Sequence, residues 1–322
     1  MKPMLGIDLG GTKTEAVLLG DDGQVHWRER VPTPAGDYDA TLAALIALVA
    51  HGRAAAGGEV SIGIGTPGTV TADGRMKNCN SQCLNGRALP RDLEAALGQP
   101  VAVANDANCL ALSEATDGAG AGHGVVFAAI LGTGVGAGIA VHGRVLTGPN
   151  GVAGEWGHNP LPWAEADHDP RWRCYCGQAG CIETLVSGPG LARDHHGAGL
   201  HCSASASTPS AAPTAEQIAA AAARGDAACL ATLERHASRL ARALAGIINV
   251  LDPDIVVLGG GLSRMPHLYE RVPALWSQWV VSGGVREPVR TRLAPSRHGD
   301  ASGVRGAAWL GRQLVQGGHG GR

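Results

Sequence analysis

The sequence has few aromatic residues and almost no net charge. Its 322 residues include one phenylalanine and three tyrosines, and the formal net charge is −2. Such a small charge gives no electrostatic reason to expect a nucleic-acid or anionic-membrane partner. We find no uninterrupted apolar run long enough to cross a bilayer, and the chain reaches Asp8 without the apolar stretch of a secretory signal. We therefore expect a cytoplasmic protein without a membrane or nucleic-acid partner.

The composition favours two folded lobes that are rich in tight turns. A chain of 322 residues is longer than one typical compact domain needs, and a hydrophobic share of 44% can supply buried cores. The 49 glycines indicate many turns and close backbone approaches. In a reducing compartment the eight cysteines are better explained as thiols or metal ligands than as disulfides.

Short apolar runs and longer alanine-rich runs follow the same order in both halves of the chain. In the first half we predict strands at residues 4–9, 14–19, 25–31, 60–64 and 101–104, and helices at 40–56, 90–97 and 106–116. In the second half we predict strands at 125–131, 135–141, 144–146, 255–258 and 289–293, and helices at 215–223 and 227–250. The order βββαβαβα indicates a duplicated α/β unit. We expect irregular chain at 149–173 and a Ser-, Ala- and Pro-rich insertion at 197–213.

A glycine-rich turn joins the first two predicted strands of each half. The turns are Gly10-Gly11-Thr12-Lys13, which follows Asp8, and Gly132-Thr133-Gly134. The backbone N–H groups of such turns can form a nest for an anion, and Asp8 can hold a metal ion through water. Two turns facing each other would cradle a polyphosphate between lobes, as phosphoryl transfer requires.

Glycine-rich turns of this kind also occur in simpler and in better-known structures. Either turn can be a simple hairpin. Residues 6–13 have the spacing of a P-loop, but the order is Gly-Thr-Lys and a strand follows where a P-loop has a helix. Gly132, Gly134 and Ala137 match the dinucleotide fingerprint, yet a strand pattern continues after them. The elements that follow each match therefore exclude a P-loop and a dinucleotide-binding fold. A simple hairpin remains an alternative for either turn.

A dense group of soft ligands predicts a zinc site. Cys174, Cys176 and Cys181 lie within eight residues, and His158 precedes them. One imidazole and three thiolates suit closed, tetrahedral zinc, which indicates a structural metal with no open position for catalysis. Unrelated thiols in a loop are the alternative. The other cysteines have no comparable partners and are expected to be free thiols: Cys79, Cys83, Cys109, Cys202 and Cys229.

Polar residues follow one predicted strand and surround the cysteine cluster. Asn105 and Asp106 come directly after the strand at 101–104, at the end where α/β sheets bind ligands. Asp106 can take a proton from an attacking hydroxyl, although by itself it is better explained as a helix N-cap. Zinc at the cluster would hold Glu155 and Glu183 rigidly toward a hydroxyl-rich ligand; without it each would be an ordinary surface residue.

Seven motifs in order make the sequence resemble the ROK family of sugar kinases and repressors. They are Asp8-Leu9-Gly10-Gly11-Thr12-Lys13-Thr14, Gly65-Thr66-Pro67-Gly68, Asn105-Asp106-Ala107-Asn108, Gly132-Thr133-Gly134, Gly154-Glu155-Trp156-Gly157-His158, the cysteine cluster with Glu183, and Gly259-Gly260-Gly261. The resemblance covers residues 5 to about 310, apart from the insertion. It implies an actin-like ATPase (ribonuclease H-like) fold with an active-site cleft between two βββαβαβα lobes. The lobes would be 1–116, completed by a helix near 302–314, and 117–301, with a zinc loop at 154–183.

The resemblance also implies residue roles. Asp106 would be the general base that activates the sugar hydroxyl. Contacts to the sugar would come from Asn80, Asn105, Asp106, Glu155, His158 and Glu183. ATP phosphates, with Mg²⁺, would be held by Asp8, Gly10, Gly11, Thr12, Lys13, Gly132, Thr133 and Gly134, and the adenosine by Gly259, Gly260 and Gly261. The ligands of a structural zinc would be His158, Cys174, Cys176 and Cys181.

Two segments suggest a substrate within the family. Residues 77–86 and 155–162 are most similar to bacterial fructokinases that also accept mannose, so we expect fructose to become fructose 6-phosphate. The alternatives are an N-acetylglucosamine kinase or a glucokinase. We expect residues 78–85 to leave no apolar recess for an acetamido methyl group.

The remaining expectations concern regulation, assembly and the metal. A non-enzymatic, sugar-binding ROK regulator is disfavoured, because we find no DNA-binding module before the first strand. A homodimer is expected. Zinc loss should weaken sugar binding more than ATP binding, because the nucleotide turns lie elsewhere in the sequence.

Overall fold

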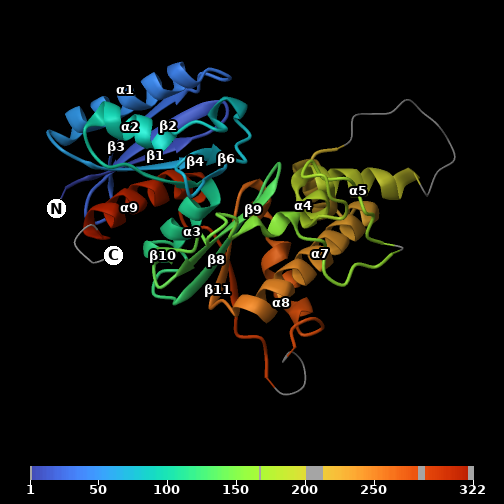
Figure 1. Ribbon diagram of the computed structural model, residues 1–322. Coiled ribbons are helices and arrows are strands. Elements are labelled where there is room, and N and C mark those ends of the chain that lie inside the picture. Colours follow the sequence, from blue (N-terminus) through green and yellow to red (C-terminus); the bar gives the residue numbers. More distant parts are fainter. Residues whose placement is uncertain (1, 167, 201–212, 282–286, 318–322) are drawn as a thin grey trace. The chain divides into compact units, whose positions relative to one another are not determined.

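A computed structural model describes residues 2–166, 168–200, 213–281 and 287–317 of the chain (Figure 1). Cys202 and most of the predicted insertion at 197–213 lie outside these residues. By compactness the chain divides into two units. They are Met1–Ala128 with Gly138–Ala153 and Arg297–Arg322, and Ala129–Ala137 with Gly154–Ser296. The predicted lobe boundaries, 1–116 with 302–314 and 117–301, stay a prediction.

The first half of the chain forms a five-stranded sheet in the order β3-β2-β1-β4-β7. Its strands are β1 (Met4–Leu9), β2 (Lys13–Leu19), β3 (Val25–Pro32), β4 (Ser61–Thr66) and β7 (Ala102–Asn105). Strand β1 runs antiparallel to β2 and parallel to β4. The helices are α1 (Tyr38–Ala56), α2 (Leu89–Leu97) and α3 (Asp106–Thr116), and a small ribbon is formed by β5 (Thr69–Val70) and β6 (Met76–Lys77).

The second half repeats this strand order. Its sheet has the order β10-β9-β8-β11-β12, so each sheet places its first three strands in reverse and adds two more beside the first. The strands are β8 (Val125–Leu131), β9 (Val135–Val141), β10 (Arg144–Val145), β11 (Ile255–Gly259) and β12 (Arg292–Pro295). The predicted duplication of βββαβαβα is confirmed by this shared topology, with extra helices inserted in the second copy.

The helices of the second half are more numerous than the sequence predicted. They are α4 (Ile182–Val186), α5 (Gly188–Leu200), α6 (Ala215–Ala223), α7 (Ala227–Leu251), α8 (His267–Trp276) and α9 (Ser302–Gly317). Short 3₁₀ helices occur in both halves: η1 (Gln82–Leu84) in the first, and η2 (Glu155–His158), η3 (Gly261–Arg264) and η4 (Gly299–Ala301) in the second. Helices α4, α5 and α8 were not predicted, and the strand expected at 289–293 is found at Arg292–Pro295.

Alternation along the strands of the first sheet gives it two different faces. Leu5, Ile7 and Leu9 of β1 belong to a core that includes Leu45 and Leu48 of α1. Because side chains in a strand alternate, the residues between them point to the other face, where Met4 packs with α9. Figure 1 shows α1 and α2 on one side of this sheet and α9 on the other. Asp8 therefore lies on the α9 face.

Glycines let α9 approach that face closely. A Cβ at Gly6 would overlap the carbonyl oxygen of Val304, and a Cβ at Gly63 would overlap that of Ala307. From the helix side, Gly311 lies against Ile62, where a Cβ would come within 2.5 Å of the Ile62 backbone. The abundant glycine of the sequence thus has a packing role here that no larger residue can take.

Helix α1 is long and apolar enough, by length and composition alone, to cross a membrane. Its 18-residue window has a mean hydropathy of 1.2, with 28% of that window buried. The helix also carries Asp39 and Arg53, and its buried residues pack in the core of the first sheet. A core helix of a soluble protein passes the same test, so this one helix is weak evidence for a membrane span.

A buried ion cluster fastens α7 in the second unit. The Asp169 carboxylate accepts hydrogen bonds from Arg239 Nε at 2.8 Å and Arg242 Nη1 at 2.6 Å, and these three side chains are almost completely buried. Arg239 also pairs with Asp194 of α5 at 2.9 Å. The two arginines lower the pKa of Asp169 below its ordinary value although burial alone would raise it.

Candidate active site

The first glycine turn is closed by backbone hydrogen bonds and braced by a threonine. Gly10 N–H donates to the Lys13 carbonyl at 3.1 Å. The Thr33 hydroxyl donates to the Gly10 carbonyl at 2.8 Å and lies 2.8 Å from the Thr14 hydroxyl, while Thr33 N–H donates to the Thr12 carbonyl at 3.0 Å. Thr33 was not predicted, and its only signal in the sequence is a Thr-Pro pair directly after β3. Gly11, Thr12 and Lys13 are exposed.

The carboxylate of Asp8, just before this turn, has a raised pKa. Burial, which is the largest cause, and the charges of Asp106 and Glu15 together raise the pKa of Asp8 from 3.8 to about 6, against the opposing effect of Lys13. Gly303, at the start of α9, lies beside it, because a Cβ there would be 3.6 Å from Asp8 Oδ2. Asp8 and Asp106 thus influence each other electrostatically within one unit, an arrangement that suits a bound cation.

Asn105, and not Asp106, caps helix α3. The Asn105 side chain accepts a hydrogen bond from Ala107 N–H at 2.9 Å in an extended cap conformation. Asp106 occupies the first helical position, where its Oδ1 also accepts from Ala107 N–H at 2.8 Å. Its side chain is exposed. The N-cap interpretation of Asp106 is therefore wrong.

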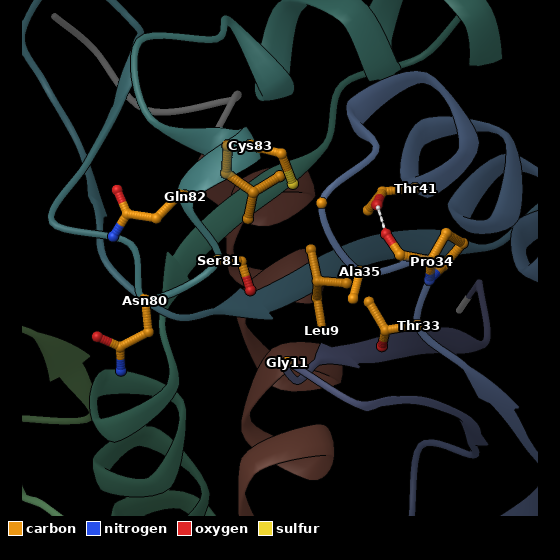
Figure 2. A pocket seen from close by; sticks show the side chains of 12 residues that line it. Leu9, Gly11, Thr33, Pro34, Ala35, Thr41, Asn80, Ser81, Gln82 and Cys83 are labelled. Carbon is orange, nitrogen blue, oxygen red and sulfur yellow. Dashed lines mark hydrogen bonds between the residues drawn. The ribbon is translucent and has the colours of Figure 1, made fainter.

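A pocket lies between the first turn and the loop at 79–85 (Figure 2). Its volume is about 260 Å³, and Asn80 stands at one end of the row of side chains. The apolar part of its wall comes from Leu9, Pro34, Ala35, Cys83 and Leu84. The expectation that this segment leaves no apolar recess is wrong, because it did not anticipate that residues 33–36 and Leu9 would border the same space.

The loop beside this pocket is held by its own asparagine. The Asn85 side chain accepts from Cys79 N–H at 2.9 Å and donates to the Cys79 carbonyl at 3.0 Å. Asn85 therefore fixes the loop conformation, while Asn80 is exposed beside the pocket. Cys79 is buried, and that burial raises the pKa of its thiol to about 11.

The predicted metal ligands converge in the second unit. The ligand atoms of His158, Cys174, Cys176 and Cys181 all lie within 4.8 Å of one another. Cys176 Sγ is 3.7 Å from Cys181 Sγ, and Cys174 Sγ is 3.5 Å from His158 Nδ1. Tetrahedral zinc at about 2.3 Å from sulfur separates its ligand atoms by roughly 3.8 Å. The donor set and its spacing therefore fit a zinc ion bound through His158 Nδ1.

The second nitrogen of His158 faces acidic and phenolic groups. His158 Nε2 lies 3.0 Å from the Tyr175 hydroxyl and 3.9 Å from Glu155 Oε2. Tyr175 also packs edge-on against the imidazole, with the ring centroids 5.0 Å apart. Metal on Nδ1 would leave Nε2 for a polar ligand. Tyr175, between two ligand cysteines, is a neighbour that was not predicted from the sequence.

The two other glycine turns also lie in the second unit. In the turn between β8 and β9, Gly132 N–H donates to the Gly134 carbonyl at 3.0 Å, and Thr133 is exposed. After β11, Gly260 adopts a φ of 80°, and a Cβ there would be 2.5 Å from the Leu131 carbonyl oxygen. Gly261 is exposed with open space where its Cβ would be. A flat group can therefore approach this backbone closely.

The predicted sugar contacts are divided between the units. Asn80, Asn105 and Asp106 belong to the first unit, and Glu155, His158 and Glu183 to the second. Their joint role around one sugar stays a prediction, as does the pairing of the first two glycine turns. Within the units, the structure brings Asp8 near Asp106 and brings Glu183 to within 3.9 Å of Cys174 Sγ.

Comparison with known proteins identifies the class. Residues 4–314 match the model of the ROK family. An N-acetyl-D-glucosamine kinase of Shigella flexneri is 40% identical over 316 residues, covering 95% of this chain and 98% of that one. A ROK hexokinase from Thermus thermophilus superposes with a TM-score of 0.82 at 29% identity, covering 98% and 99% of the two chains. A ROK glucokinase from Streptomyces griseus, solved with glucose and AMPPNP, has a TM-score of 0.74 at 29% identity over 97% and 99%.

This fold, its repeated sheets and these relatives define an ATP-dependent sugar kinase with the actin-like ATPase fold. The chain belongs to the ROK family. The predicted family and fold class are thereby confirmed. The curated relatives are named for N-acetylglucosamine, which was the alternative substrate, and not for fructose.

Proposed function

We propose that the chain is an N-acetylglucosamine kinase, which transfers the γ-phosphate of ATP to the terminal hydroxymethyl group of the sugar. The observation that carries this proposal is the 40% identity, over nearly the whole of both chains, to an N-acetyl-D-glucosamine kinase. The fructose assignment rested on two short segments. A match over 316 residues weighs more than those segments.

The chemistry assigns one step to each group. Asp106, exposed at the start of α3, takes the proton of the sugar hydroxyl while the hydroxyl oxygen attacks the γ-phosphorus. The bond from that phosphorus to the bridging oxygen breaks, and ADP leaves. Asp8 and the turn that follows it would hold the phosphates together with Mg²⁺, which would supply positive charge to neutralise them. The other phosphate contacts are Gly132, Thr133 and Gly134, and adenosine lies on Gly259, Gly260 and Gly261.

Sugar hydroxyls are bound by carboxylates, amides and an imidazole. The side chains are Asn80, Asn105, Glu155, His158 and Glu183. Structural zinc on the four clustered ligands would hold the loop of His158 in place. In the first unit, the pocket beside Asn80 offers Leu9, Ala35 and Leu84 to the methyl of an acetamido group and Asn80 to its amide. Such a recess supports an N-acetylated sugar over fructose.

We also propose a cytoplasmic homodimer. The cysteines within the described residues are all free thiols, which suits a reducing compartment.

A coupled assay for ADP release tests the substrate. N-acetylglucosamine, glucose, mannose and fructose are compared by kcat/KM, with phosphorus NMR to locate the phosphate on the product. We expect N-acetylglucosamine to have the highest value, with phosphate on the terminal hydroxymethyl oxygen. A higher value for fructose would overturn this proposal and restore the fructokinase assignment.

A further inference from the structure

The segment around α4 holds the second glycine turn at both of its ends. Glu183 Oε2 accepts a hydrogen bond from Val135 N–H at 3.0 Å, just after the turn. Gly188 N–H donates to the carbonyl of Gly132, the first residue of the turn, at 2.8 Å. These contacts join parts of the chain that are 48 or more residues apart in sequence.

The fit between Glu183 and the turn depends on a glycine. A Cβ at Gly134 would lie 2.8 Å from Glu183 Oε2, which is closer than real Cβ contacts come. Any larger residue at 134 would therefore push the carboxylate away from Val135 N–H. The glycine that leaves the turn backbone open to an anion also makes room for this acid.

The same segment is continuous with the metal cluster. Helix α4 begins at Ile182, directly after the ligand Cys181, and Glu183 Oε1 lies 3.9 Å from Cys174 Sγ. On the other arm of the metal loop, the Gly154 carbonyl accepts from Ala137 N–H at 3.1 Å. Gly157 packs so closely that a Cβ there would overlap the Val135 carbonyl. Both arms of the metal loop therefore contact the start of β9.

We infer that Glu183 is a positioning residue for ATP, which holds the Gly132–Gly134 turn in its phosphate-binding conformation by accepting Val135 N–H. A turn fixed in advance does not have to be ordered when the phosphates bind, so less binding energy is lost. The inference rests on the proposed assignment of ATP phosphates to this turn. It revises the expectation that the metal loop acts on the sugar alone.

Nucleotide binding without sugar tests the inference. Calorimetry measures the affinity of each variant for Mg²⁺ with a non-hydrolysable ATP analogue, and zinc content is checked so that forms with equal metal are compared. We expect Glu183→Ala to weaken analogue binding about 10-fold, the effect of one hydrogen bond to a charged group. Glu183→Gln keeps an oxygen acceptor, so its affinity for the analogue should fall about threefold or less. Glu165→Ala, which removes an exposed carboxylate in the same loop, should leave analogue affinity unchanged.

A double-mutant cycle separates this contact from general loss of structure. Gly134→Ala should weaken analogue binding in the native background and cost distinctly less when residue 183 is already alanine, because the crowded carboxylate is gone. Additive effects of the two changes would overturn the inference, as would equal losses for the alanine and glutamine variants at 183.

Hydrogen exchange over residues 132–136 shows which part has failed if analogue affinity does not change. Faster exchange in Glu183→Ala with unchanged affinity would overturn the assignment of the phosphates to this turn, and the inference with it. Unchanged exchange together with unchanged affinity would overturn the inference that Glu183 holds the turn in place. Failure of the wild-type protein to phosphorylate N-acetylglucosamine would overturn only the substrate proposal, since this experiment contains no sugar.

Discussion

The Asn105 side chain accepts the Ala107 N–H at 2.9 Å and so caps α3, a role that Asp106 does not have to fill. We therefore expect Asp106→Asn to lower phosphoryl transfer by about 10²–10⁴-fold, because an amide cannot take the hydroxyl proton. Thermal stability should change little. Single-turnover transfer measures the effect, with Asn105→Ala as a comparison that should lose about 1 kcal/mol of stability through the cap. Near-normal transfer by Asp106→Asn would remove Asp106 from catalysis.

Asp8 should make stability depend on pH in the metal-free protein. The pKa of Asp8 is raised from 3.8 to about 6 in the folded state, so the folded protein binds more protons than the unfolded one between those values. The contribution of Asp8 to the stability of the folded state is fully present below about pH 4 and is lost as the pH rises through about 6. We expect Asp8→Asn to melt higher than the native chain at pH 7.5 with chelator present, and to lose this advantage at pH 4. Thermal unfolding at both pH values decides, and a lower melting temperature at pH 7.5 would contradict the burial argument.

Gly63→Ala should destabilise the first unit. The new Cβ would overlap the Ala307 carbonyl, so α9 must shift away from β4, at a cost of about 1–3 kcal/mol. Gly58→Ala is the matched control, because nothing lies within 4 Å of a Cβ there. Urea unfolding compares the two, and an equal effect would mean that α9 packs less tightly than described.

Metal removal should affect both substrates. Protein purified without added metal should contain about one zinc per chain by elemental analysis. After chelation we expect the affinity for N-acetylglucosamine and for the ATP analogue to fall together, because the metal loop carries His158 and also contacts the start of β9. Adding zinc back should restore both affinities. An analogue affinity that survives chelation, while sugar affinity falls, would favour the original expectation from the sequence.

Thr33→Val should weaken ATP binding through the first turn. Valine keeps the shape but leaves the Gly10 carbonyl without its 2.8 Å hydrogen bond, so we expect KM for ATP to rise about five- to tenfold with little change in kcat. Thr33→Ser keeps the hydroxyl and serves as the control. Steady-state kinetics at saturating sugar measures both variants, and a serine variant as weak as valine would point to packing as the cause.

Local patterns predicted most of the strands and the grouping of the four candidate metal ligands. Strands β1, β8 and β9 begin and end where their apolar runs do. The convergence of these ligands was predicted because three of them, the cysteines, lie within eight residues. Helices α5 and α8 were missed because α5 opens with Gly188-Pro189-Gly190 and α8 contains Pro273. Proline is tolerated in the first turn of a helix, and packing overrides weak propensity elsewhere.

Contacts between distant segments were not predictable in this way. The Glu183–Val135 hydrogen bond and the wall that Pro34 and Ala35 give to the pocket depend on which elements the topology brings together. The sequence does not distinguish a glycine in a turn from a glycine at a close helix contact. The packing of Gly63 against α9 therefore could not be predicted from its neighbours in the sequence. The duplicated order of elements was visible, but the shared strand order of the two sheets became evident only from their pairing.

The packing of α9 on β1 and β4 has a consequence for synthesis on the ribosome. Residues 302–317 are made after about 240 residues that follow β4, which takes roughly 10 to 50 s at ordinary elongation rates. During that time the face of the first sheet that includes Gly6 and Gly63 is not covered by α9. The sheet that is translated first therefore keeps one face uncovered until this distant helix has been made.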